Sequence, residues 1–540
     1  MSDPLLTITD LRVRLPDGAD RPYAVEDVSL DLQRNEILCI VGESGSGKSM
    51  MARATIGLLP RRLHAESGEI RFRGENLLKA DETHLQELRG DAISMIFQEP
   101  MTALNPLMTI GEQIDEVLVL HKTLTKSERR ARILETLEAV RLPEPEMIIN
   151  AYPHEISGGQ RQRAMIAMAL ILEPEILIAD EPTTALDVTT QAQILHLISE
   201  LQRARGTGTL FITHDFGVVA EIADKVAVMK DGRLVETGPA SDILNRPQHA
   251  YTRELIAAVP NLAAHGMTVG TDAETVLNVR DLKKIYRGRR GLFSTSARDV
   301  YAVRGVSFEL KRGETLGIVG ESGSGKSTVA RCVVRLTESD GGHIALQGKD
   351  LLQLSRSEMM PYRRRIQMVF QDPYGSLNPR LRVGQMIAQG PMIHGVSSAK
   401  ANDKAAELLE LVGLEPSAAD RFPHEFSGGQ RQRIGVARAL ALEPQVLVAD
   451  EPVSALDVSV QAQVLRLLAD IRDRFELSML FITHDLRVAA QVCHSVAVMC
   501  EGEIVEYGST GTLFNDPQHA YTKELLSAVP GKNWDNPLAS

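Results

Sequence analysis

Eight consecutive residues near the start of the chain have the types and spacing that could hold the phosphates of a nucleotide. The segment follows the apolar run EILCIV, opens a helical pattern, and reads Gly42-Glu43-Ser44-Gly45-Ser46-Gly47-Lys48-Ser49. Glycines let successive backbone N–H groups converge on phosphate oxygens, and the N-terminus of the following helix adds partial positive charge. Lys48 would reach the β- and γ-phosphates, while the Ser49 hydroxyl would bind Mg²⁺. A flexible Gly/Ser turn would explain the composition but not the position between a strand and a helix.

The same pattern occurs a second time in the same context. The second copy reads Gly320-Glu321-Ser322-Gly323-Ser324-Gly325-Lys326-Ser327-Thr328. Lys326 and Ser327 stand where Lys48 and Ser49 stand in the first copy. Two matched copies predict two P-loops and therefore two sites for ATP and Mg²⁺.

Two apolar strand patterns downstream end in adjacent carboxylates. The runs ILIA and VLVA lead into Asp180-Glu181 and Asp450-Glu451. We expect Asp180 and Asp450 to hold the Mg²⁺ shell, and Glu181 and Glu451 to polarise or deprotonate the attacking water. A solvated strand end would explain one such pair, but hardly two at one spacing from a P-loop.

Two histidines repeat at matched positions. His214 and His484 each lie in the sequence FITHD, equally far beyond Glu181 and Glu451. A lone histidine is more often structural. Position and repetition instead favour a γ-phosphate sensor that also holds the water and the glutamate in line.

The elements that must position these residues also repeat across nearly the whole chain. Short β-rich runs such as EILIADE alternate with helical stretches such as TTQAQILHLISELQRA, which predicts an α/β sandwich around a largely parallel sheet in each half. The copies end alike, in PQHAYTRELIAAVP and PQHAYTKELLSAVP, and a small, polar segment follows the first ending. We therefore expect a first domain at 1–261, a linker at 262–275 and a second domain at 276–540.

Composition narrows the function classes. The 540 residues carry 59 Lys plus Arg against 71 Asp plus Glu, and the net charge of −12 argues against general affinity for nucleic acid. The four cysteines show no metal-ligand spacing. No apolar run reaches the roughly 18 to 20 residues that cross a bilayer, and the N-terminus lacks a secretory pattern. We expect a protein that is cytosolic or that rests on a membrane through partners.

Further motifs give the chain a resemblance to the ATP-binding subunits of ABC transporters. The SGGQ signature lies between P-loop and acidic strand in both halves, preceded by Ile156 and Phe426 where the family usually has Leu. Gln98 and Gln371 match the family's Q-loop, and Ala185-Leu186-Asp187 and Ala455-Leu456-Asp457 match its D-loop. The signature residues are Ser157-Gly158-Gly159-Gln160 and Ser427-Gly428-Gly429-Gln430.

The resemblance implies a fold and a set of site residues. It implies two tandem P-loop ABC-type nucleotide-binding domains, each with a RecA-like core, a helical signature subdomain and a short C-terminal extension, at about 240–261 and 510–531. Gln98 and Gln371 would contact Mg²⁺ beside the catalytic groups, and Tyr286 would stack on adenine. Leu15 stands at the matching place in the first half, where Tyr23 is a possible substitute.

The resemblance also implies two composite ATP sites in a head-to-tail sandwich. The nucleotide on Lys48 would meet the signature at 427–430, and the nucleotide on Lys326 the signature at 157–160. Each signature immediately precedes a helix, so its backbone donors and helix dipole can cap a γ-phosphate. Both halves keep lysine, glutamate, signature and histidine, so we expect two sites competent for hydrolysis.

More specific features resemble the peptide importer branch, which covers dipeptide, oligopeptide, nickel and glutathione uptake. These are FQEPMTALNP, FQDPYGSLNP, YPHEISGGQRQR and the two PQHAYT endings. The branch implies two transmembrane permease subunits, a periplasmic solute-binding protein, and a peripheral position on the cytoplasmic face of the bacterial inner membrane. Some relatives bind an iron–sulfur cluster through cysteines of the extension. This chain has no cysteine in the stretches that directly follow Pro260 and Pro530, at 261–275 and 531–540, so no cluster is expected.

Alternative functions stay open at this point. A soluble tandem ABC protein acting on ribosomes or DNA would share the ATP chemistry, but such proteins typically carry a long charged linker or zinc cysteine clusters. A sugar-type fused ATPase commonly has one degenerate site, whereas both sites look intact here. The solute of an importer could also be nickel or an opine, since permeases and binding protein select it.

Overall fold

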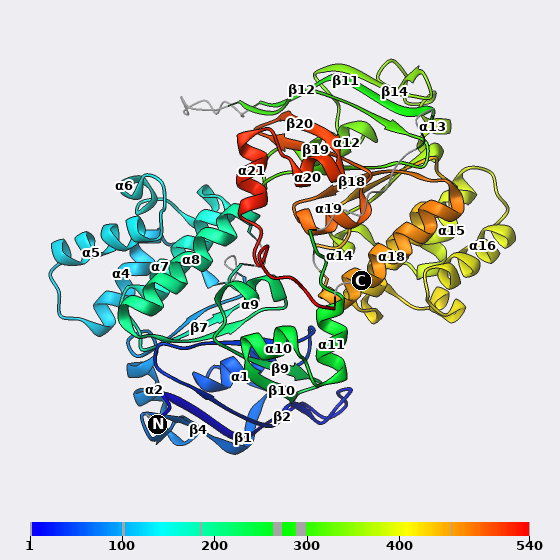
Figure 1. Ribbon diagram of the computed structural model, residues 1–540. Helices are drawn as coiled ribbons and strands as arrows, with labels where there is room; N and C mark the ends of the chain where they lie inside the picture. Colours follow the sequence, from blue (N-terminus) through cyan, green and yellow to red (C-terminus); the bar gives the residue numbers. More distant parts are fainter. Residues whose placement is uncertain are drawn as a thin grey trace. The chain divides into compact units, whose positions relative to one another are not determined.

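The computed structural model describes residues 3–99, 103–183, 186–262, 270, 273–287, 299–454 and 456–538. The chain forms two compact units, one made of Met1–Val259 with Ala528–Ser540 and the other of Pro260–Ser527 (Figure 1). Most of the expected linker, the D-loop alanines Ala185 and Ala455, and residues 100–102 of the FQEP segment lie outside the described residues.

The first unit is centred on a six-stranded sheet with the order β10-β9-β3-β8-β7-β6. Its strands are β3 (Ile37–Val41), β6 (Ile93–Ile96), β7 (Ile176–Asp180), β8 (Gly208–Ile212), β9 (Lys225–Lys230) and β10 (Arg233–Pro239). All neighbours pair in parallel except β10, which pairs antiparallel with β9. The predicted α/β fold with a largely parallel sheet is confirmed. The carboxyl ends of β3 and β7 carry the P-loop and the acidic pair to the same edge of the sheet.

A second, antiparallel sheet has the order β2-β1-β4-β5. Its strands are β1 (Leu6–Arg14), β2 (Tyr23–Leu32), β4 (His64–Phe72) and β5 (Glu75–Asn76). One hydrophobic core joins Leu6 of this sheet to Ile40 and Leu210 of the central sheet and Met51 of α1 (Lys48–Thr55).

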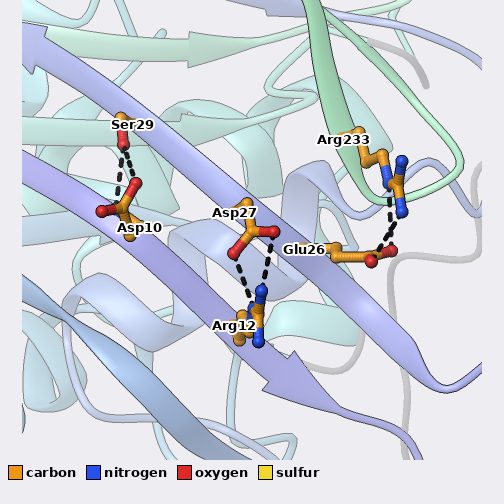
Figure 2. A network of polar contacts seen from close by, with 6 residues as sticks. All are labelled: Asp10, Arg12, Glu26, Asp27, Ser29 and Arg233. Atoms are coloured by element: carbon orange, nitrogen blue, oxygen red, sulfur yellow. Dashed lines mark hydrogen bonds and ion pairs between the residues drawn. The ribbon is translucent and has the colours of Figure 1, made fainter.

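Polar contacts join the first antiparallel sheet to the edge of the central sheet (Figure 2). Arg233 of β10 donates to both carboxylate oxygens of Glu26 on β2, at 3.1 and 2.7 Å. Arg12 of β1 donates to Asp27 of β2 at 2.6 and 2.9 Å. The first pair links β2 to β10 at the edge of the central sheet, and the second links β1 to β2 within the antiparallel sheet.

The remaining helices of the first unit fall into two groups. Helices α4 and α5 both pack against α7 and form the helical subdomain with α6. The helices are α2 (Glu82–Leu88), α4 (Ile110–His121), α5 (Lys126–Ala139), α6 (Pro145–Ile148), α7 (Gly158–Leu170), α8 (Val188–Arg205), α9 (Phe216–Ile222), α10 (Ala240–Asn245) and α11 (Ala250–Ala257), with 3₁₀ turns at Leu77–Lys79 and Pro153–Glu155.

The last residues of the chain belong to the first unit. The Gly531 N–H donates to Glu221 of α9 at 3.4 Å, and the Trp534 indole N–H donates to Asn245 of α10 at 3.3 Å. The Asn536 amide donates to the Ile256 carbonyl of α11 at 2.9 Å. The tail thus contacts three helices of the first unit and ends beside α11 (Figure 1).

The second unit repeats both sheets. Its central sheet has the order β16-β17-β18-β13-β19-β20, and its antiparallel sheet β12-β11-β14-β15. The strands are β11 (Thr275–Tyr286), β12 (Val300–Lys311), β13 (Thr315–Val319), β14 (Gly341–Leu346), β15 (Lys349–Asp350), β16 (Ile366–Val369), β17 (Val446–Asp450), β18 (Ser478–Thr483), β19 (Ser495–Cys500) and β20 (Glu503–Ser509).

The helices of the second unit follow the same plan as those of the first. They are α12 (Lys326–Val333), α13 (Met360–Arg365), α14 (Pro373–Ser376), α15 (Val383–Ile393), α16 (Ser398–Leu411), α17 (Gly428–Leu440), α18 (Val458–Phe475), α19 (Leu486–Val492), α20 (Thr510–Asn515) and α21 (Ala520–Ser527), with 3₁₀ turns at Pro416–Asp420 and Pro423–Glu425.

Candidate active site

Each P-loop turns sharply between its strand and its helix, at positions that only glycine fits. Gly47 has φ of 101° and Gly325 has φ of 103°, immediately before α1 and α12. A Cβ on Gly47 would meet the Ala24 carbonyl oxygen well inside contact distance, and one on Gly325 would meet that of Ala302. The glycines therefore let the loop backbone approach strand β2 or β12 closely, as well as take a left-handed turn.

The P-loop lysines are buried and held by the loop itself. Lys48 is 5% exposed, and its ammonium donates to the Gly42 and Glu43 carbonyls at 2.7 and 2.8 Å. Lys326 is 4% exposed and donates to the corresponding carbonyls of Gly320 and Glu321 at 2.8 and 2.7 Å. Each loop thus encloses a cation at the N-terminus of a helix, an arrangement suited to phosphate.

A serine and an aspartate meet in each half, as expected for a Mg²⁺ site. The Ser49 hydroxyl donates to Asp180 at 2.8 Å, and the Ser327 hydroxyl donates to Asp450 at 2.9 Å. Burial raises the pKa of Asp180 and Asp450 despite these hydrogen bonds, and the adjacent glutamates act in the same direction. Hydroxyl and carboxylate oxygens are the donors that Mg²⁺ prefers, so the residues fit the expected cation.

In the first half, the predicted base, sensor and Q-loop side chains converge on one carboxylate oxygen. Gln98 donates to Oε2 of Glu181 at 3.0 Å, and Nδ1 of His214 lies 3.5 Å from the same oxygen. The three residues lie just beyond the ends of β6, β7 and β8. The structure therefore brings together groups that are far apart in the sequence.

The second half repeats this arrangement. Gln371 donates to Glu451 at 2.9 Å, and Nδ1 of His484 lies 3.1 Å from the same carboxylate oxygen. Burial works to raise the pKa of Glu451, but the hydrogen bond and charge of His484 outweigh it and lower the pKa. Burial likewise works to lower the pKa of His484, and Glu451 outweighs it and raises the pKa. The pair favours an ionised glutamate, as a general base requires.

A pocket of about 970 Å³ opens beside the second P-loop. Its walls include P-loop residues from Ser322 to Thr328, together with Gln371 and Glu451. Among its described lining residues the aromatic one is Tyr301. Tyr286 is 42% exposed, lies beneath the Lys284 ammonium at 5.6 Å, and is not part of this lining. Its role against adenine stays a prediction.

Each signature forms the start of a helix. The Ser157 side chain accepts from the Gln160 N–H at 3.3 Å, and the Gln160 side chain accepts from the Ser157 N–H at 2.9 Å. Ser427 and Gln430 form the same capping box at the start of α17. The serine side chain accepts the backbone N–H of the glutamine, and the glutamine side chain accepts that of the serine. The helix therefore begins at the glycines between them.

Sequence reasoning missed two kinds of residue that contact the P-loops. Arg21 donates to the Gly45 carbonyl and lies 3.6 Å from Asp231, whereas Asp299 stands at the matching position of the second half. The Tyr251 hydroxyl accepts from the Glu43 N–H at 3.2 Å, and the Tyr521 hydroxyl accepts from the Glu321 N–H at 3.2 Å. The repeated PQHAYT ending was the only signal for these tyrosines, and it carried no information about their contacts.

Two family models match the chain. One, described as "ABC transporter", matches residues 25–184 and 303–454. The other, described as "Oligopeptide/dipeptide transporter, C-terminal region", matches residues 235–291 and 505–537. Each model matches once in each half, in agreement with the internal repeat.

Relatives align along nearly the whole chain. A protein named glutathione import ATP-binding protein GsiA, from Shigella dysenteriae serotype 1, is 48% identical over 97% of this chain and 89% of its own. A protein named peptidoglycan transport ATP-binding protein YejF, from Agrobacterium fabrum, is 49% identical over 98% of this chain and 97% of its own.

A comparison of folds matches an isolated cassette. The ATP-binding cassette MJ0796, in a dimeric post-hydrolysis state bound to ADP and Pi, is 30% identical and covers 44% of this chain and 98% of its own, with a TM-score of 0.40.

Within the described residues, every helix is too short or too polar to cross a membrane.

Proposed function

Because the chain belongs to the ABC transporter family and its two halves are ATP-hydrolysing cassettes, we propose that it powers the import of peptide-like solutes through partner permeases. The observation that carries this proposal is the match to the oligopeptide/dipeptide transporter C-terminal region at the end of each half. Relatives named for glutathione import and for peptidoglycan transport, at 48% and 49% identity, agree with a solute of peptide character.

The chemistry at each site is hydrolysis of the γ-phosphate bond of ATP. Glu181 accepts the proton of the attacking water, and Gln98 and His214 hold the carboxylate in position, because both contact its Oε2. Glu451, Gln371 and His484 have the same roles in the second half. Lys48 and Lys326 bind the β- and γ-phosphates.

The serine and aspartate pairs are the proposed Mg²⁺ residues. Ser49 with Asp180, and Ser327 with Asp450, would hold the ion together with Gln98 and Gln371. When bound, Mg²⁺ supplies positive charge that offsets the charge of the β- and γ-phosphate oxygens.

We also propose that each ATP is completed by the signature of the opposite half. The support is chemical: Ser157 and Ser427 begin 13-residue helices, whose first backbone N–H groups and dipole suit a γ-phosphate. In this proposal the 427–430 signature serves the nucleotide on Lys48, and the 157–160 signature serves the nucleotide on Lys326.

The proposed partners are two permease subunits and a periplasmic solute-binding protein, at the cytoplasmic face of the bacterial inner membrane. A pocket of about 650 Å³ next to Gln371 supports docking of a permease segment. Its lining combines Phe370 and Met368 with the cations Arg363 and Arg438, so it offers both apolar and charged contacts beside a residue that touches the catalytic glutamate.

The hydrolytic assignment is tested by changing both proposed bases, Glu181→Gln and Glu451→Gln. We expect ATP hydrolysis to fall by roughly 10²-fold or more while ATP binding persists, because the amide keeps the shape but cannot accept the proton. Phosphate release measures hydrolysis and equilibrium titration measures binding. Glu200→Gln, the same change on the exposed face of α8, is the control and should hydrolyse ATP normally. Undiminished hydrolysis in the double variant would contradict the assignment.

The solute class is tested with the assembled transporter in membranes. We expect ATP hydrolysis to rise when the solute-binding protein is loaded with glutathione, a dipeptide or a longer peptide. Stimulation by a nickel-loaded binding protein, with no response to any of these peptides, would contradict a peptide-like solute while leaving the ATPase assignment intact.

A further inference from the structure

The C-terminal extension of each half contacts the P-loop of the same half. In the first unit, Tyr251 of α11 is 6% exposed and its hydroxyl accepts from the Glu43 N–H at 3.2 Å. In the second unit, the Tyr521 hydroxyl of α21 accepts from the Glu321 N–H at the same distance. The family match to the extension covers both tyrosines, whereas the match to the cassette ends well before them.

The tyrosine is positioned by a chain of contacts that starts on the strand before the extension. In the first unit, Glu236 of β10 accepts from the backbone N–H groups of Gln248 and His249 at 2.7 and 3.1 Å. His249 then accepts the Tyr251 N–H through Nδ1 at 3.2 Å and begins the helix. These contacts fix the backbone on which the Tyr251 ring is carried to the P-loop.

The second unit contains the same arrangement. Glu506 of β20 accepts from the N–H groups of Gln518 and His519 at 2.7 and 3.1 Å. His519 accepts the Tyr521 N–H at 3.2 Å. Burial works to raise the pKa of Glu506, but the backbone and side-chain hydrogen bonds that it accepts outweigh burial and lower the pKa. Glu506 is therefore an ionised acceptor in this arrangement.

The residue that receives the tyrosine also receives the P-loop lysine. The Glu43 N–H donates to Tyr251, and the Glu43 carbonyl accepts from the Lys48 ammonium at 2.8 Å. Glu321 is held in the same way, between Tyr521 and Lys326, with 2.7 Å to the lysine. The second residue of each P-loop is thus fixed through both its N–H and its carbonyl, one contact from the extension and one from the phosphate-binding cation.

We propose that Tyr251 and Tyr521 are positioning residues for nucleotide binding, which hold each P-loop in its phosphate-binding conformation before ATP arrives. A loop that is ordered in advance loses less conformational freedom when it binds, so its affinity is higher. The extension therefore sets the affinity of the ATP site without touching the nucleotide. This inference rests on ATP binding by the P-loops of the proposed function, and it assigns the extension a role in that binding.

The experiment removes only the two hydroxyls, by Tyr251→Phe and Tyr521→Phe together. Loss of one hydrogen bond per site should raise the KM for ATP, and the dissociation constant in an ATP titration, by about three- to tenfold. The kcat should stay within about twofold, because the catalytic groups around Glu181 and Glu451 are unchanged. Tyr507→Phe removes a hydroxyl from β20, outside the P-loop contact, and is the matched control.

The readouts separate positioning from a merely structural role. A merely structural role would lower the unfolding temperature and would not raise KM while leaving kcat unchanged. Thermal unfolding is therefore measured on every variant. An unchanged KM and dissociation constant in the double variant would overturn the inference, as would a fall in kcat at constant KM. Failure of the proposed import function would appear as absent solute uptake with normal ATP binding by the wild type, and these titrations would then still decide the role of the tyrosines.

Discussion

Glu181 and Glu451 adopt a left-handed backbone conformation, with φ of 47° and 46°. Successive side chains of a strand point to opposite faces of the sheet, so Asp180 and Glu181 would diverge if β7 simply continued. The left-handed turn lets the aspartate reach Ser49 while the glutamate reaches Gln98 and His214. Such φ values are energetically unfavourable for residues other than glycine. The backbone strain at Glu181 and Glu451 therefore accompanies the proposed catalytic arrangement.

A half-buried histidine in the second half predicts a pH-dependent stability. His494 accepts the Thr315 N–H through Nδ1 at 3.0 Å, and burial, with Arg472, lowers its pKa. The unfolded chain protonates this histidine at a higher pH than the folded chain. The contribution of His494 to the free energy of unfolding should therefore be constant above about pH 6.5 and fall as the pH drops from there toward the folded pKa, by at most about 1.4 kcal/mol per pH unit.

The first half supplies the matched variant for this prediction. Asp224 stands at the equivalent position and accepts the Ile37 N–H at 2.8 Å. His494→Asp should preserve the acceptor and remove the loss of stability between about pH 6.5 and 5.5. Denaturant unfolding at several pH values measures the difference between variant and wild type. Parallel pH profiles would contradict the assignment.

Much of each candidate site was predictable at the residue scale, because adjacent residues in a motif carry their own chemistry. The P-loop and the Asp-Glu pair are local patterns, and in the structure Lys48 lies within its own loop and Asp180 accepts from Ser49. The contact between Tyr251 and the P-loop joins residues 208 positions apart. No spacing rule relates two such segments, so a contact of this kind emerges only when the fold is known.

At the scale of elements, helix α15 begins very close to the 3₁₀ turn at Pro416–Asp420. The second residue of α15, Gly384, must therefore be small. A Cβ on Gly384 would lie 2.9 Å from the Ala419 Cβ and 3.1 Å from the Ala419 carbonyl oxygen. We expect Gly384→Ala to destabilise the helical subdomain of the second unit by about 1–3 kcal/mol, because backbone has to move. Thermal unfolding of the variant measures this cost.

A second glycine of the same subdomain provides the control. Gly435 lies inside α17, and nothing approaches within 4 Å of the place where its Cβ would be. Gly435→Ala should stabilise the protein by about 0.5–1 kcal/mol, through the lower entropy of the unfolded chain. If both substitutions changed stability in the same direction, the close packing at the start of α15 would not be the cause.

The elements themselves were predictable only in part. Alternating apolar and helical runs predicted the parallel central sheet, since each run is long and uniform. The antiparallel sheets gave no such pattern, because β1 and β11 contain irregular pairing around Asp10 and Asp281, both with left-handed φ. These positions interrupt the two-residue period on which the recognition of strands depends.

At the scale of the whole molecule, the tail at 528–540 is part of a unit whose other residues end at Val259. The Asn536 amide donates at 2.9 Å to the Ile256 carbonyl in the last turn of α11, which also accepts from the Val259 N–H at 3.1 Å. Asn536→Ala should lower the stability of the first unit by about 1 kcal/mol. Asn533→Ala, three residues away on the exposed side of the tail, should leave it unchanged.

Fluorescence offers a direct measurement of this prediction. Trp534 is the only tryptophan of the chain, and its indole N–H donates to Asn245 of the first unit. Its emission should therefore change when the first unit unfolds, although the residue follows the second unit in sequence. Emission that follows the unfolding of the second unit alone would contradict the placement of the tail.

Because of the placement of the tail, the first unit is synthesised first but its contacts are completed last. A ribosome makes residues 1–259 first, yet the contacts of α9, α10 and α11 with residues 531–536 form only after the entire second unit has been translated. A nascent chain, or one cut short by a premature stop codon, therefore presents a first unit whose surface over these three helices is still uncovered.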